Sequence, residues 1–377
     1  MLTTLTVCAC GDSLLKTVFC QKYFPRTINN PDCELVASQV LANHSRPLPT
    51  LELGDPSKPA LFFIHGWPDS AAVWAAQFAH FCYDGSYYCV AATWANFHPD
   101  FLDAPDRELT FVSQMAKLAA TMRETKMRDT TLVIHDWGAF LGYQMMYRYP
   151  ELVRRTVAFD IGFTCDNCTT NTTYQDVNRE AWATHDSMKS ESSAEYFSAP
   201  CVDCAVWRTT WPYVYPLSSR NFTPAADLGP VKPLMFLWGN ETAKGLPRRA
   251  NTLFFGQSWL DQVNRMPYGK TVEVPSDHWL SFRAAEFVNR AVDDWLRSLP
   301  AVSVKTWEAD EGQGFVGRPL KELRQAFQAA FLTGYISVDF PGGPMKRRAP
   351  DEMRLIVNAA GSSEESTVER VWGYYGD

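Results

Sequence analysis

Short apolar segments alternate with helical segments along most of this chain, and no other feature of the sequence limits its fold as strongly. β-branched and aromatic residues predict strands at residues 51–53, 60–64, 87–92, 131–134, 155–159, 233–238 and 271–274. Apolar residues at helical spacing predict helices at residues 109–124, 139–149 and 284–299. Strands joined through helices run parallel, because the helix returns the chain to the same edge of the sheet. The sequence therefore predicts an α/β fold with a mostly parallel, doubly wound sheet.

The alternation lapses between the two halves of the predicted sheet. Residues 165–226 are rich in Thr, Asn, Ser and Trp and lack a strand rhythm. We therefore predict four regions, namely a first core part at 1–163, a partly helical insertion at 164–226, a second core part at 227–300 and a C-terminal extension at 301–377. A helix at 320–331 and a strand at 353–357 are expected in the extension, whose role stays open.

Charge and hydropathy exclude two kinds of partner. The formal net charge is -7, whereas nucleic-acid binding needs a basic surface that neutralises phosphates. No segment reaches the roughly 20 apolar residues of a membrane span. The N-terminus lacks the basic start and apolar centre of a signal peptide. We expect no nucleic-acid partner, no membrane span and a cytoplasmic location, and the oligomeric state stays open.

Four of the ten cysteines form two C-x-x-C pairs, Cys165 with Cys168 and Cys201 with Cys204. Four thiolates can close a tetrahedral zinc site, but the segment between the pairs is longer than in a typical zinc ribbon. Zinc and disulfides stay open as alternatives, and we predict unligated thiols and no metal. The G-x-G-x-x-G match at residues 312–317 follows an acidic stretch instead of a strand, so we predict no cofactor.

The segment from Thr131 to Ala139 carries the strongest candidate for a catalytic side chain. A β-branched strand runs into Asp136, and a helix follows at once. A residue at such a sharp turn presents its side chain above the sheet edge, and the small Gly138 lets the helix approach the strand. Asp136 is therefore predicted as a nucleophile, with a helix N-cap as the alternative. Ile134 stands where such turns usually hold a small residue, so we expect local strain.

Two further segments place chemistry at the same edge. The strand at 60–64 runs into His65-Gly66-Trp67-Pro68, where the backbone N–H of Trp67 can point into the site. Downstream, His278 lies on a loop between a predicted strand and the last helix. A histidine in that position suits the role of general base.

These three segments, in this order, resemble the alpha/beta hydrolase superfamily, in the branch that contains epoxide hydrolases and haloalkane dehalogenases. His65 to Pro68 resembles the epoxide hydrolase oxyanion turn, Ile134 to Ala139 resembles the nucleophile turn of both groups, and His278-Trp279 resembles their histidine loop. The resemblance covers residues 30–300 and implies an α/β-hydrolase fold, with the insertion as a cap domain. The loop Thr93 to Pro99 departs from it, since the family usually has a glycine-containing loop there.

The resemblance implies a reaction through a covalent ester. An oxygen of Asp136 attacks an sp3 carbon and displaces an alkoxide or a halide, and water activated by His278 then attacks the ester carbonyl. The N–H groups of Trp67 and Trp137 would hold the oxyanion on Asp136. Epoxide hydrolysis of a small apolar substrate is the main prediction. A haloalkane dehalogenase and a non-catalytic binding protein are the alternatives.

Epoxide hydrolases protonate the departing oxygen from tyrosines of the cap. The densest aromatic group of the insertion favours Tyr213 or Tyr215 as the proton donor, ahead of Tyr174 and Tyr196.

The acid that orients His278 has two candidate positions. Asp160 ends the strand at 155–159 and lies 24 residues after Asp136, as in some dehalogenases. Glu241 follows the strand at 233–238, near the place where epoxide hydrolases carry their acid. We favour Asp160, because a carboxylate at the end of an apolar strand is costly without a partner. The alternative for Asp160 is a structural bond to backbone N–H groups near Gly162.

Overall fold

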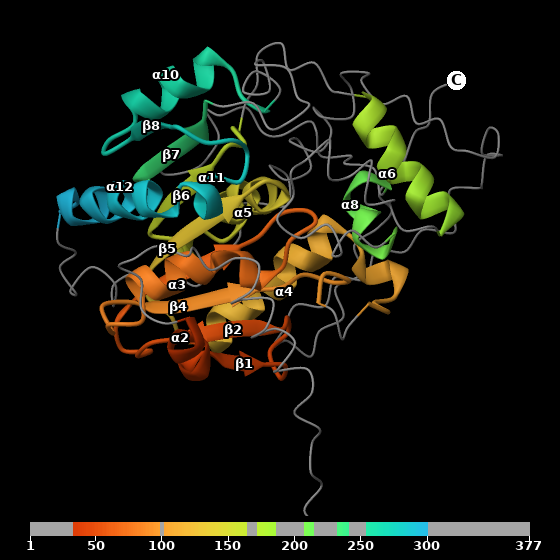
Figure 1. Cartoon of the computed structure of the whole chain (residues 1–377), viewed down its shortest axis with the longest axis horizontal. Coiled ribbons are helices and arrows are strands. Elements are labelled where there is room, and N and C mark those ends of the chain that lie inside the picture. The colour runs from red at the N-terminus through yellow and green to blue at the C-terminus, as the bar shows by residue number, and fades with distance from the viewer. Residues whose placement is uncertain are drawn as a thin grey trace, which may run out of the picture. The chain divides into compact units, whose positions relative to one another are not determined.

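The computed structural model describes residues 33–98, 102–163, 172–185, 207–214, 232–240 and 254–300. Within them an eight-stranded sheet has the order β1-β2-β4-β3-β5-β6-β7-β8 (Figure 1). The strands are β1 (Leu41–Asn43), β2 (Thr50–Leu53), β3 (Pro59–Ile64), β4 (Tyr88–Ala92), β5 (Arg128–His135), β6 (Arg155–Phe159), β7 (Leu234–Gly239) and β8 (Lys270–Val274). β2 is antiparallel to β1 and β4, and the other pairs are parallel. The predicted mostly parallel sheet is confirmed.

Helices cover both faces of the sheet, because successive strand side chains point to opposite faces. Phe62 and Ile64 of β3 pack in one apolar cluster with α4, α5 and α10, whereas Leu61 and Phe63 pack in a second cluster with α2, α3 and α12. The helices of the two layers are α2 (Cys33–Gln39), α3 (Ala75–Phe81), α4 (Phe111–Glu124), α5 (Trp137–Arg148), α10 (Gln257–Arg265), α11 (Leu280–Arg283) and α12 (Ala285–Ser298). Short 3-10 helices are η2 (Ala71–Trp74), η3 (Asp106–Glu108) and η4 (Pro150–Leu152).

The described part of the insertion is helical. It contains α6 (Thr172–Thr184), η6 (Trp207–Thr210) and α8 (Trp211–Val214). α6 and α8 lie side by side, and Arg179 Nε donates to the backbone oxygen of Tyr213 at 3.1 Å (Figure 1). The four predicted region boundaries stay predictions. The extension and the cysteines of both C-x-x-C pairs lie outside the described residues.

The register brings the ends of the central strands to one edge of the sheet. Ile64 of β3 pairs with Ile134 of β5, and His135 pairs with Phe159 of β6. On the other side of β6, Gly239 of β7 pairs with Val274 of β8. The segments that follow these strands therefore leave from the same edge, where ligands of open α/β sheets bind.

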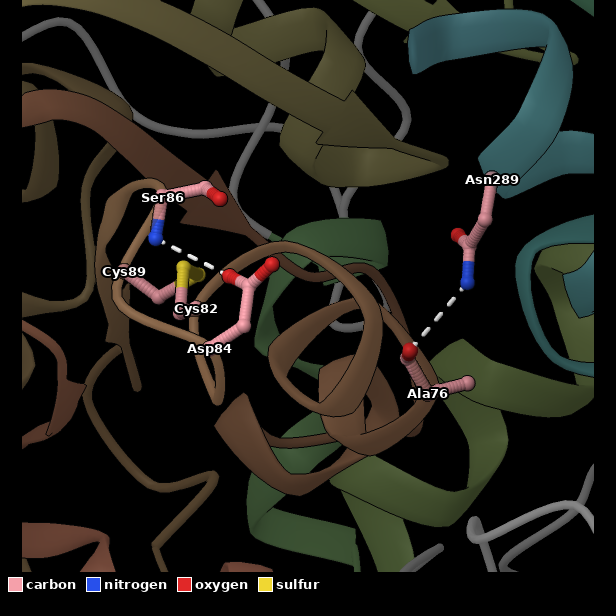
Figure 2. The surroundings of a disulfide bond; sticks show 6 residues. All are labelled: Ala76, Cys82, Asp84, Ser86, Cys89 and Asn289. Carbon is pink, nitrogen blue, oxygen red and sulfur yellow. Dashed lines mark hydrogen bonds between the residues drawn. A yellow bond between two sulfur atoms is a disulfide. The ribbon is translucent and has the colours of Figure 1, made fainter. Parts of the chain in front are cut away.

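A disulfide between Cys82 and Cys89 joins the end of α3 to β4 (Figure 2). Both cysteines are buried. On the neighbouring turn of α3, the backbone oxygen of Ala76 accepts a hydrogen bond from Asn289 Nδ2 of α12 at 3.1 Å. α3 is thereby tied both to the sheet and to α12. Disulfides are rare in the reducing cytosol, so this bond weighs against the cytoplasmic location, which stays a prediction. In the part of the chain that the structure describes, no helix is long and apolar enough to cross a membrane.

Candidate active site

Asp136 lies at the turn between β5 and α5, in a backbone conformation that only close packing can hold. Its φ is 51° and its ψ is -126°, a region that L-residues rarely adopt. Gly66 makes room for the carboxyl group, since a Cβ there would lie 2.4 Å from Asp136 Oδ1. Gly138 lets α5 approach β3, since a Cβ there would lie 2.3 Å from the backbone oxygen of Ile64. The side chain of Asp136 does not act as the N-cap of α5.

The bulk of Ile134 is accommodated by a glycine on the following helix. Ile134 is fully buried. A Cβ on Gly142 of α5 would lie 2.5 Å from Ile134 Cγ2 and 2.9 Å from its Cδ1. Ile134 and Gly142 therefore form one packing unit, in which the large side chain before the turn fills the space that glycine leaves beside the helix.

Gly142→Ala is expected to destabilise the protein by about 1–3 kcal/mol, because the new methyl group overlaps Ile134. In an Ile134→Ala background the same change should be neutral or stabilising. The two closest carbons, Cγ2 and Cδ1, are then gone, and alanine is a better helix former than glycine by about 1 kcal/mol. Urea unfolding of the four proteins measures both values. Equal costs of Gly142→Ala in the two backgrounds would contradict the packing unit.

Backbone N–H groups and His278 surround the Asp136 carboxylate. Oδ1 accepts a hydrogen bond from the N–H of Trp67 at 2.7 Å, and the N–H of Trp137 also bonds to the carboxylate. Oδ2 lies 3.5 Å from His278 Nε2. The three segments predicted to share one site are therefore in contact.

Asp160 lies on the other side of His278. Its Oδ2 is 2.7 Å from His278 Nδ1, and its Oδ1 accepts the N–H of Gly239 at 3.2 Å. The N–H of Gly162, one of the partners in the structural alternative, bonds to the backbone oxygen of Phe254 at 2.9 Å. Glu241, the other candidate acid, lies outside the described residues.

Burial and the two carboxylates act in opposite directions on His278. Burial lowers its pKa, but the hydrogen bonds and charges of Asp136 and Asp160 outweigh burial and raise the pKa to about 10. Burial has the opposite sign for an acid and raises the pKa of Asp136, but the hydrogen bond and charge of His278 bring that pKa below its usual value. At neutral pH the two groups therefore form a charged pair, with Asp136 ionised as a nucleophile requires.

Three contacts that hold the histidine loop are absent from the sequence interpretation. His135 Nε2 bonds to the backbone oxygen of His278 at 2.9 Å, and burial lowers the pKa of His135 to about 4. His135 is thus neutral and donates through Nε2. Trp279 Nε1 donates to Asp69 Oδ2 at 3.2 Å. Asp277, the residue before His278, pairs with Arg283. The only sequence signal for His135 was its place directly before Asp136.

Tyr213 packs over the two residues whose N–H groups hold the carboxylate. The centroid of its ring lies 5.0 Å from that of Trp137 and 5.7 Å from that of Trp67. Tyr196 and Tyr215 lie outside the described residues, as does the side chain of Tyr174. In the described part of the chain, no group of three or more His, Cys, Asp or Glu could hold a metal ion.

A family model matches this arrangement along most of the chain. The model described as "Alpha/beta hydrolase family" aligns with residues 61–343. The chain belongs to the alpha/beta hydrolase family. The resemblance drawn from the three motifs and the fold that it implied are both confirmed.

Within the alpha/beta hydrolase family, this chain is similar to enzymes of two kinds. It is 26% identical over 113 residues to Epoxide hydrolase 1 of Caenorhabditis elegans, across 29% of this chain and 27% of that protein. It is 29% identical over 102 residues to a haloalkane dehalogenase of Mesorhizobium japonicum, across 26% of this chain and 30% of that protein. The matched region thus spans less than a third of each curated relative.

Solved structures of epoxide hydrolases extend the likeness to about 70% of this chain. An epoxide hydrolase from Vigna radiata aligns with a TM-score of 0.51 and 16% identity, over 70% of this chain and 99% of that one. A variant of the Solanum tuberosum epoxide hydrolase aligns with a TM-score of 0.53 and 15% identity, over 69% of this chain and 100% of that one. At such identities the likeness concerns the fold.

Proposed function

We propose that this protein hydrolyses epoxides to diols through an ester on Asp136. The observation that carries the proposal is the contact set of one carboxylate. Asp136 Oδ1 accepts the N–H of Trp67 at 2.7 Å, while Oδ2 lies 3.5 Å from His278 Nε2. One oxygen is thus placed to become an oxyanion, and the other is left to attack. A serine-type esterase mechanism fits less well, because Asp attacking an ester would give an anhydride.

In the first step, Asp136 Oδ2 attacks an epoxide carbon and the carbon–oxygen bond of the ring breaks. The departing oxygen takes the phenolic proton of Tyr213, or of Tyr215. The products of this step are a neutral alkyl ester on Asp136, a free hydroxyl on the substrate and a tyrosinate, which takes up the proton that the His278 imidazolium releases.

In the second step, His278 takes a proton from water and the hydroxide attacks Cγ of Asp136. The oxyanion forms on Oδ1 and is held by the N–H groups of Trp67 and Trp137. Collapse of this intermediate expels the diol oxygen, which takes the proton from His278. The carboxyl proton left on Asp136 then passes to His278, which restores the charged pair. Esterification removes one of the two charges that raise the pKa of His278. The base therefore loses its proton more readily once the ester exists.

A haloalkane dehalogenase is the second candidate, and the position of Asp160 supports it. Asp160 at the end of β6 bonds to His278 Nδ1 at 2.7 Å, and some dehalogenases carry their acid at that place. A halide leaves without a proton, so this reaction would not use Tyr213.

Tyr213→Phe separates the two chemistries. With a panel of chromogenic epoxides, we expect diol formation by the wild type and a loss of roughly 100- to 10,000-fold in the variant, because a positioned general acid is absent. Halide release from alkyl halides should be largely indifferent to the change. Tyr143→Phe is a matched control, since Tyr143 is buried away from Asp136 and donates to the backbone oxygen of Ile161. Halide release without diol formation would select the dehalogenase, and activity on neither panel would favour a binding protein.

A further inference from the structure

The loop after β4, residues 93–98, departs from the family pattern and is fixed firmly to the core. Asn96 is fully buried and has a φ of 67°, a conformation that Asn tolerates better than most residues. Its Oδ1 accepts the N–H of Ala104 at 2.9 Å. The N–H of Ala95 donates to Gln114 Oε1 of α4 at 3.1 Å. The loop is therefore a rigid support beside the sheet edge that carries Asp136.

The same loop binds the described segment of the insertion through two hydrogen bonds. Trp211 Nε1 of α8 donates to the backbone oxygen of Ala95 at 3.1 Å. Asn96 Nδ2 donates to the backbone oxygen of Arg208 at 3.4 Å. Trp211 is fully buried, and a buried N–H that lost its acceptor would carry a desolvation cost of about 1–3 kcal/mol. The position of α8 is thus set by its hydrogen bond to the backbone oxygen of Ala95 and by the bond from Asn96 to Arg208.

Aromatic contacts link Trp211 to the residues beside Asp136. The ring of Phe111 lies 5.3 Å from Trp211 and 5.8 Å from Trp137, stacked on the latter. Tyr213 follows Trp211 by two residues and meets Trp137 from another direction, at 5.0 Å. Trp211, Phe111, Trp137 and Tyr213 therefore form a continuous set of packed rings that ends beside Asp136.

We propose that Trp211, held by the backbone oxygen of Ala95, is a positioning residue that fixes Tyr213 for proton transfer to the opening epoxide. This inference rests on the proposed function. It assigns a purpose to the unusual loop, which supports the cap where the family usually has a glycine-containing loop. A displacement of about 1 Å in a reacting group can cost about 100-fold in rate, so the anchor of the proton donor has a large kinetic effect.

The test compares Trp211→Phe with wild type in both half-reactions, with an epoxide that the wild type hydrolyses. The variant keeps an aromatic ring and loses the Nε1–H donor. We expect ester formation to slow by about 10- to 100-fold, with ester hydrolysis unchanged within about twofold. Rapid quench and mass spectrometry of the Asp136 peptide separate the two rates. Trp259→Phe is the matched control, because Trp259 is also fully buried but its Nε1 has no partner among the described residues.

Two additional variants distinguish positioning from a general loss of packing. In a Tyr213→Phe background, Trp211→Phe should cause no additional slowing, since the group that it positions is already gone. Asn96→Gly keeps the backbone conformation but removes the bonds to Arg208 and Ala104, and we expect it to slow ester formation alone. Equal slowing of both half-reactions, or full additivity with Tyr213→Phe, would overturn the inference. Absence of any adduct on Asp136 in the wild type and in His278→Gln would instead defeat the proposed function.

Discussion

His278→Gln is expected to abolish turnover while an alkyl ester accumulates on Asp136. Attack by Oδ2 needs an ionised carboxylate and the proton donor of the cap but no base, and the N–H of Trp67 that binds Oδ1 is not altered by this substitution. Hydrolysis of the ester needs a base, which glutamine is not. We expect a loss of at least about 1,000-fold in steady-state turnover. Intact-protein mass spectrometry should show one added substrate mass, and peptide mapping should place it on Asp136.

Two controls make this result specific. Asp136→Asn should form no adduct in the same incubation. His80→Gln, a histidine replacement on the exposed side of α3, should turn over like the wild type. An adduct on another residue would sink the mechanism. So would a single turnover in labelled water that puts the label into the diol without labelling Asp136.

Asp160→Asn is expected to slow turnover by roughly 1,000- to 10,000-fold with little change in folding, as for the loss of the acid in other His-based sites. Oδ1 can still accept the N–H of Gly239, which supports the local backbone. The amide, however, cannot supply the negative charge that faces His278 Nδ1 at 2.7 Å in the wild type. The base then loses its preferred tautomer and much of its orientation, so hydrolysis of the ester should slow far more than its formation.

In the same Asp160→Asn variant, we expect the pKa of His278 to be lower than in the wild type. Asp160 is one of the two carboxylates that oppose burial and raise the pKa of His278 to about 10. Removing its charge should bring that pKa down, so the imidazolium signal followed by NMR should disappear at lower pH than in the wild type. Glu241→Gln is the comparison. If Glu241→Gln slows ester hydrolysis and lowers the pKa while Asp160→Asn does neither, the acid is assigned to the wrong residue.

The sheet was predictable because its strands are short apolar runs separated by helical periodicity, and β6 was predicted at its observed bounds of 155–159. α3 was missed because nearly all of its residues are buried, which removes the polar stripe that reveals an amphipathic helix. α10 was also missed, in a segment shorter than the windows on which periodicity is judged.

In the candidate site, too, some residues could be predicted from the sequence and others could not. Trp67, Asp136 and His278 lie on local motifs, and local motifs can be read from a sequence. The spacing from Asp136 to Asp160 suggested the acid, but only the fold brings Asp160 Oδ2 to His278 Nδ1. The bond between Trp211 and Ala95 joins residues 116 positions apart. No local pattern encodes such a pair, because its partners meet only when the insertion and the core have folded together.

The pairing of Ile134 with Gly142 also limits the paths by which this chain can change. A mutation to a small residue at 134 opens a cavity next to Gly142. A mutation that adds a side chain at 142 makes that side chain overlap Ile134. The two positions are therefore expected to be epistatic, because the cost of a change at one depends on the residue at the other. A mutant library for new substrates should vary both codons together.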